Sequence, residues 1–190
     1  MATIMTEIQE RRARRAIDES KEVPSELVDR LLNAAHMAAS CSNKQPWRFL
    51  VGDADPVRQT LRDHLLGGNY WAQKAPVLMA VATRLTDDAR LDEGRDYAPF
   101  DTGMAVAHLL LQATHEGLIA HPMAGFKPGP LKKELGLPED VIVYALIAVG
   151  YPGDESHLSD KHLESEHSER DRKPLEEVAS REAFPYEDAE

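Results

Sequence analysis

SCSNKQPWRF, residues 40–49, links two segments of different character. The preceding residues 31–39 are rich in alanine and keep helical spacing, whereas residues 47–51 form a short apolar run typical of a strand. The small hydroxyl, thiol and amide side chains between them favour local hydrogen bonds over a helix, and Pro46 biases Gln45 towards extended backbone. The sequence therefore predicts a polar loop between a helix and a strand, where a planar polar ligand can be held. A helix cap followed by a turn is the simpler alternative from these residues alone.

Two further motifs accompany this loop. The loop resembles the SSxNxQPW signature of the nitroreductase family of flavoproteins, with Ala39 where that family usually has proline. RRARR at residues 11–15 is similar to the family's opening RRSxR motif, and RDRKPL at residues 170–175 resembles its closing segment. The three motifs keep the family's order and spacing across nearly the whole chain. The resemblance implies an α+β fold with a central, mostly antiparallel sheet surrounded by helices, and a long buried helix at a dimer interface.

The resemblance also implies a cofactor, non-covalently bound FMN. In the family, the opening arginine motif holds the flavin phosphate and ribityl chain, and the central loop lines the ring or the ribityl chain. Gly125 matches a segment whose backbone faces flavin N5, and Asn69 lies where the family often places an amide that touches the ring. Ala13 replaces the usual serine, so only backbone contact is expected there. The cofactor-binding positions carried over are Arg11, Arg12, Ala13, Arg15, Ser40, Cys41, Ser42, Asn43, Asn69, Gly125, Arg170 and Arg172.

The chemistry implied by the resemblance is that of an NAD(P)H-dependent flavin oxidoreductase. The flavin carries the reaction, so no catalytic side chain is assigned. Hydride is expected to pass from NAD(P)H to flavin N5 and then to a nitroaromatic, quinone, enone or related small acceptor, in a ping-pong cycle. One alternative is a specialised family member that acts on one metabolite by dehalogenation, flavin fragmentation or aldehyde reduction. Another is a non-enzymatic binding module that keeps the fold without the cofactor.

Composition limits the class of protein. A chain of 190 residues with 42% apolar and 29% charged residues is typical of a single globular domain, here residues 1–190. A net charge of −11 argues against nucleic acid and anionic membranes as partners. No apolar run is long enough to span a membrane, and no signal-peptide pattern is expected at the N-terminus. Cys41 is the single cysteine, which excludes an intrachain disulfide and favours a cytoplasmic location.

Apolar runs and capping residues divide the chain into strands and helices. Residues 76–83 (PVLMAVAT) and 141–149 (VIVYALIAV) are nearly continuous apolar runs, typical of strands covered on both faces. With residues 47–51 they are the three predicted strands, and the polar residues 84–97 are expected to be a surface excursion. The predicted helices are residues 6–18, a segment beginning at Ser25, a segment from Pro56 to Gly67, residues 101–116 and residues 129–135.

The predicted helix at residues 101–116 is apolar on nearly every face. Met104, Ala107, Leu111 and Thr114 form one stripe, and other apolar residues cover the remaining faces. A helix with this pattern is expected in the middle of a large core. In a chain of this size, the pattern favours burial between two subunits as well as within one, and so a homodimer.

Residues 154–190 form an acidic C-terminal extension with 13 acidic and five basic residues, a net charge of −8. This composition is typical of disorder, except at its RDRKPL segment. Arg170 and Arg172 are expected to project to the same side of an extended chain and to meet the arginines of residues 11–15 at one phosphate. Three histidines between residues 157 and 167 alternate with acidic residues, but a solvated acidic tail is favoured there over a metal site.

Overall fold

The computed structural model describes residues 4–89 and 92–185. In this part of the chain a four-stranded sheet has the order β1-β2-β4-β3, and every neighbouring pair is antiparallel. The predicted antiparallel α+β fold and its three predicted strands are confirmed, whereas β3 has no counterpart among the predicted strands. The strands are β1 (Trp47–Gly52), β2 (Val77–Arg84), β3 (Ile119–Met123) and β4 (Val141–Gly150).

The continuous apolar runs of β2 and β4 reflect burial on both faces of the sheet. The five residues from Val77 to Val81 are each at most 3% exposed. Alternate side chains of β2 enter different clusters, because successive residues of a strand point to opposite faces. Leu78 and Ala80 pack in one cluster, and Met79 and Val81 pack in the other.

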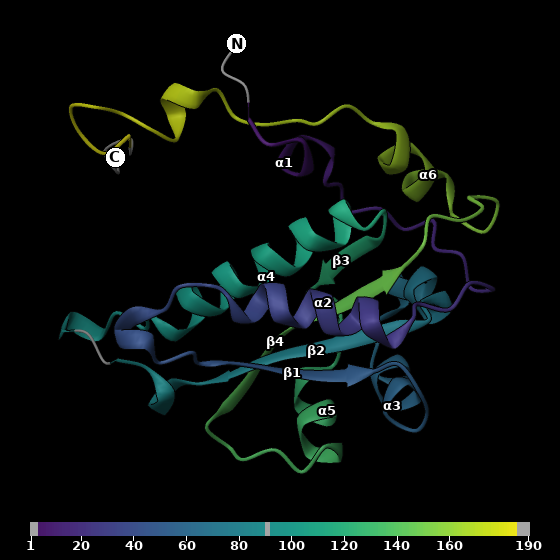
Figure 1. Cartoon of the computed structure of the whole chain (residues 1–190), viewed down its shortest axis with the longest axis horizontal. Coiled ribbons are helices and arrows are strands. Elements are labelled where there is room, and N and C mark those ends of the chain that lie inside the picture. The colour runs from purple at the N-terminus through teal and green to yellow at the C-terminus, as the bar shows by residue number, and fades with distance from the viewer. Residues whose placement is uncertain (1–3, 90–91, 186–190) are drawn as a thin grey trace.

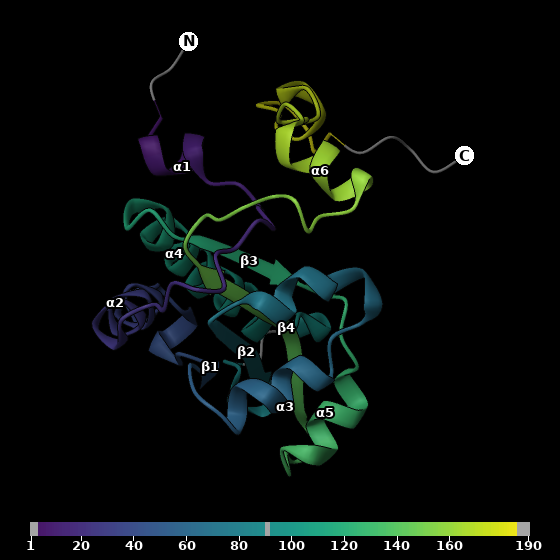
Figure 2. The same cartoon turned by 90° about the vertical axis from the view of Figure 1, so that its right-hand side faces the viewer.

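Helices cover both faces of the sheet (Figures 1 and 2). α2 (Ser25–His36) and α4 (Ala98–His115) pack over one face, and α3 (Val57–Asp63) and α5 (Pro128–Glu134) pack over the other. The third predicted helix ends at Asp63 rather than at the glycine pair. Short 3-10 turns lie at Cys41–Asn43, Gly67–Lys74, Leu85–Asp87, Asp92–Gly94 and Leu175–Glu177.

The first helix is shorter than predicted. α1 spans only Thr6–Glu10, and the helix expected over residues 6–18 is wrong beyond that point. In a longer helix the carbonyls of Ile8, Gln9 and Arg11 would accept bonds from residues 12, 13 and 15. The guanidinium group of Arg170 donates to all three carbonyls instead. The end of α1 is therefore set by a residue of the tail, which the local sequence pattern cannot reveal.

Within one chain, α4 is covered on one face only. Its buried residues are Ala98, Asp101, Thr102, Ala105, Leu109 and Ala113. In the stripe predicted from Met104 to Thr114, Ala107 is exposed and Leu111 is half-buried, while Phe100 in the first turn is 57% exposed. Burial all round this helix would therefore need a second molecule.

Part of the acidic extension is folded, whereas residues 171–184 are exposed. α6 (Asp160–His167) was not predicted, and it is anchored by Leu158 and Glu166, which are 9% and 2% exposed. Beyond it, the tail passes beside α1 and continues above α4, away from the sheet (Figure 1). None of the helices in residues 4–89 and 92–185 has the length and apolar character that crossing a bilayer requires.

Candidate functional site

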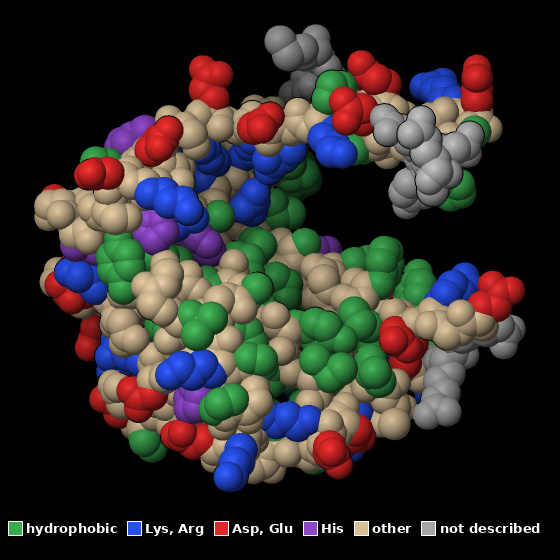
Figure 3. All heavy atoms as spheres, turned by 180° about the vertical axis from the view of Figure 1, so that it is seen from behind, with side chains coloured by type: hydrophobic (Ala, Val, Ile, Leu, Met, Phe, Trp, Pro, Cys, Tyr) green, Lys and Arg blue, Asp and Glu red, His purple; other side chains and the backbone are tan. Residues whose placement is uncertain are grey.

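Basic side chains from both ends of the chain line one pocket of about 320 Å³. We call it the arginine pocket. It lies between the segment that follows α1 and the tail that follows α6, and Figure 3 shows basic side chains gathered under this rim of the molecule. Six sequence-predicted site residues therefore lie together. The lining residues are Arg11, Arg12, Ala13, Arg15, Ser165, Ser168, Glu169, Arg170, Asp171 and Arg172.

The arginine pocket has an excess of positive charge. In the described part of the chain, no carboxylate oxygen lies within 4.0 Å of a guanidinium nitrogen of its five arginines. Burial, followed by the positive charges of Arg170, Arg172 and Arg12, lowers the pKa of Arg11. Cations held this close repel one another, and an anion placed among them would stabilise all of them.

The arginines of this pocket differ in how they are already bonded. Arg170 is engaged with backbone carbonyls of α1, and Arg12 Nη2 donates to the Ser168 carbonyl at 2.5 Å. Within the described residues, the guanidinium groups of Arg11 and Arg15 have no hydrogen-bond or ion-pair partner. Arg11 and Arg15 are therefore the donors most available to a bound anion, whereas the main role of Arg170 is structural.

The polar loop forms a tight turn with unusual backbone geometry. Ser42, Asn43 and Gln45 have φ values of 50°, 55° and 49°, in the left-handed region that non-glycine residues rarely adopt. Side-chain oxygens help to hold the turn, since Asp101 Oδ2 accepts the Cys41 N–H and Ser40 Oγ accepts the Gln45 N–H, each at 3.0 Å. Ser42 and Asn43 are exposed, so this strained turn presents polar groups at the surface.

Asn69 and Gly125 lie together, as their joint assignment to one ligand requires. Asn69 Nδ2 donates to the Gly125 carbonyl at 2.8 Å, and the Leu66 N–H donates to the same oxygen at 3.0 Å. A Cβ atom at Gly125 would lie 2.6 Å from Asn69 Nδ2, so this close approach requires glycine. Next in the chain, the Tyr70 hydroxyl accepts the Ser159 N–H at 2.7 Å, which places this segment beside the start of α6.

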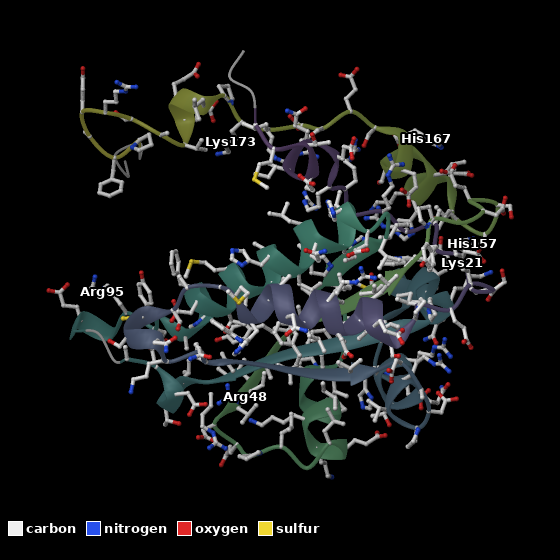
Figure 4. The ribbon with its side chains drawn as sticks, in the orientation of Figure 1. Lys21, Arg48, Arg95, His157, His167 and Lys173 are labelled. Atoms are coloured by element: carbon white, nitrogen blue, oxygen red, sulfur yellow. The ribbon has the colours of Figure 1, made fainter. Side chains whose placement is uncertain are left out.

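The polar loop and the arginine pocket lie at opposite ends of α4. Cys41 is bonded to Asp101 in its first turn, and Glu7 of α1 lies 3.0 Å from His115 in its last turn. Fourteen residues of helix separate these two contacts by roughly 20 Å. In Figure 4, Arg95, just before α4, and His167 of α6 lie at opposite ends of the molecule. One chain therefore does not bring all the predicted site residues together.

A comparison with known protein families identifies the chain. The model of the nitroreductase family matches residues 8–69 and 52–151. The chain belongs to the nitroreductase family. The family assignment made from the three motifs is confirmed.

Individual relatives agree with this assignment. An uncharacterized 15.4 kDa protein in the ask 5′ region of Mycolicibacterium smegmatis is 35% identical over 70% of this chain and 93% of its own length. A protein named NADH dehydrogenase from Thermus thermophilus is 30% identical over 72% of this chain and 81% of its own. A solved structure described as an oxidoreductase containing FMN superposes with a TM-score of 0.85 at 31% identity, covering 96% of this chain and 93% of that one.

Two buried carboxylates of this nitroreductase-family protein were missed by the sequence reasoning. Asp101 is 1% exposed and holds the polar loop, and Glu166 is 2% exposed and holds the segment after α1. Asp101 could be suspected as a charge in an apolar helix, but Glu166 lies in an acidic tail and gives no such signal. No three histidine, cysteine or acidic side chains in the described residues are grouped to hold a metal ion.

Proposed function

We propose that this NAD(P)H-dependent flavin oxidoreductase of the nitroreductase family holds FMN non-covalently, with its phosphate in the arginine pocket. The observation that carries the proposal is the convergence of five arginines from the two ends of the chain, with no carboxylate within 4.0 Å among the described residues. When bound, FMN supplies the hydride-accepting and hydride-donating chemistry of the reaction. No protein nucleophile is needed, and none is assigned.

The arginine pocket fits a phosphate group in charge and in donors. Phosphate offers three strong acceptor oxygens, and guanidinium groups bind such oxygens with charge-assisted hydrogen bonds. The guanidinium groups of Arg11 and Arg15 have no partner in the part of the chain that the structure describes, and Arg172 is exposed at the rim of the pocket. In this proposal these three bind the phosphate directly, the Ala13 backbone contributes an N–H, and Arg170 chiefly holds α1 in place.

The proposal includes a homodimer in which the polar loop of one copy completes the site of the other. In a single chain, roughly 20 Å of α4 separates the loop from the arginine pocket. The exposed apolar surface supports the same arrangement, since Met37 and Phe100 are 77% and 57% exposed. A groove of about 500 Å³ between α1, α2 and α4 includes Met5, Met37 and Leu111 in its lining. Figure 3 shows an open hollow between the tail and the body, bordered by hydrophobic side chains.

In the assembled site, Ser40, Cys41, Ser42 and Asn43 would line the ring or the ribityl chain, and Asn69 and Gly125 would lie at the ring edge. NAD(P)H and the acceptor would occupy the same place in turn, which predicts ping-pong kinetics. The proposed acceptors are nitroaromatics, quinones, enones and related small molecules. The single cysteine supports a cytoplasmic location for this reaction.

The absorption spectrum of the purified protein tests the proposal directly. A flavin band should be present, and the flavin released on denaturation should be FMN. Reduction by NADH or NADPH alone should bleach this band before any acceptor is added. A protein that binds no FMN on reconstitution would contradict the proposal and support a binding module without cofactor. Turnover of one metabolite, with no activity on several unrelated acceptors, would identify a specialised enzyme.

A further inference from the structure

We infer that Glu166 is a positioning residue for the arginine pocket. Its buried carboxylate fixes the backbone at Arg15 and Ala16, so that the neighbouring arginines face the pocket. This inference rests on the proposed phosphate site, and it assigns to the acidic tail a role that its sequence does not suggest.

The contacts of Glu166 lie on the segment that supplies the pocket. Oε1 accepts the Ala16 N–H at 2.9 Å and also accepts the Arg15 N–H. Oε2 lies 3.6 Å from Arg14 Nη1, and the same Nη1 donates to the Glu166 carbonyl oxygen at 2.9 Å. One residue of α6 thus binds three consecutive residues that are about 150 positions away in the sequence.

Burial of this carboxylate is costly unless it is compensated. A charged group removed from water needs hydrogen bonds and an opposite charge to balance the lost hydration. Two backbone N–H groups and Arg14 provide them, although Oε2 has no hydrogen-bond partner among the described residues. An apolar side chain could fill this position without that cost, but it could not bind the two N–H groups. The charge is therefore matched to the backbone that it holds.

The arrangement decides which arginines face the pocket. Arg14 is held on the Glu166 side and does not line the arginine pocket, whereas its neighbours Ala13 and Arg15 do. The backbone carbonyl of Glu166 also accepts Arg14 Nη1, which ties the end of α6, where the tail begins, to this segment. Glu166 therefore joins the two halves of the pocket without lining it, and its carboxylate holds the half that carries Arg11 to Arg15.

Flavins with and without a phosphate can separate this role from a general effect on folding. Riboflavin has the same ring and ribityl chain as FMN but no phosphate. A residue that only stabilises the fold would affect the binding of both flavins, whereas one that positions the phosphate site would affect FMN alone. The ratio of the two dissociation constants is therefore the informative readout.

The experiment uses full-length Glu166→Ala, Glu166→Asp and Glu166→Gln, with Glu164→Ala as the matched control because Glu164 is exposed on the same helix. FMN and riboflavin are titrated by flavin fluorescence. Glu166→Ala should weaken FMN binding by about tenfold or more and change riboflavin binding by less than about twofold. Glu166→Gln should stay within about threefold of the parent for FMN, because its amide oxygen can accept the same N–H groups. Glu164→Ala should bind both flavins as the parent does.

Three results would overturn the inference: parental FMN binding by Glu166→Ala, equal weakening of both flavins, or a loss in Glu166→Gln as large as in Glu166→Ala. If Glu166→Ala does not fold, Glu166→Asp decides by the same ratio, because its shorter side chain keeps the charge but cannot reach both N–H groups.

Arg11→Ala separates failure of this inference from failure of the proposed function. If Arg11→Ala loses the preference for FMN while Glu166→Ala keeps it, only the positioning role is wrong. If the parent shows no preference for FMN over riboflavin, the phosphate site itself is wrong.

Discussion

Replacing Arg11 and Arg172 with alanine, singly and together, tests whether the two ends of the chain bind one phosphate. Both residues line the arginine pocket, and they lie 161 positions apart in the sequence. A hydrogen bond to a charged group contributes about 1.5–3 kcal/mol. Each single substitution should therefore weaken FMN binding by roughly ten- to a hundredfold. Arg11 should lie at the upper end of this range because it is half-buried, and Arg172 at the lower end because water and salt screen an exposed cation.

The double variant tests whether the two cations share a ligand. The positive charge of Arg172 already contributes to the lowered pKa of Arg11, so the two groups interact even without an anion. If both cations bind one phosphate, the loss of FMN-binding free energy in the double variant should differ from the sum of the losses in the single variants by more than about 0.5 kcal/mol. Independent sites would give additive losses within that margin.

The assay is a fluorescence titration of FMN with the parent and the three variants. Lys173→Ala is the matched control, because Lys173 is exposed in the same tail and does not line the pocket. Arg170 is unsuitable for this purpose, since its loss would also free the carbonyls of α1. Parental affinity in Arg172→Ala would show that the tail is not part of the site, and strict additivity would refute the shared phosphate.

Three further outcomes are expected. The dimer interface is expected to bury more than about 2,000 Å². Sedimentation should therefore show a dimer of about twice 21.2 kDa, and a stable flavin-bound monomer would contradict the shared site. Burial lowers the pKa of His121 from 6.5 to about 4, so the unfolded chain binds more protons between these pH values. The free energy of unfolding should therefore fall by up to about 3 kcal/mol as the pH drops through this window, and urea unfolding of the parent should show more of this loss than His121→Gln. Gly125→Ala should lower the free energy of unfolding by about 1–3 kcal/mol, because the new Cβ would displace Asn69; Gly129→Ala, with nothing within 4 Å of its Cβ, should not.

The pattern of apolar residues was sufficient for the three long strands and for most of the helices that pack on them. Burial on both faces leaves a continuous apolar run in the sequence, as in residues 76–83 and 141–149, and this signal does not depend on distant residues. The family could also be assigned from the sequence, because three short motifs keep their order and spacing along the chain. The residues proposed to bind the phosphate, Arg11, Ala13, Arg15 and Arg172, all come from two of these motifs.

The end of α1, the fold of the tail and the separation of the two parts of the site depended on contacts between distant segments. α1 stops at Glu10 because Arg170, about 160 positions away, binds its free carbonyls. Glu166 looks like one more solvated acid in the tail until it is seen to bind the backbone at Ala16. The rigid length of α4 holds Cys41 apart from the arginines, although the motifs suggest one shared ligand. Local propensity cannot predict such partners, because each bond joins groups that come close together only after the chain has folded.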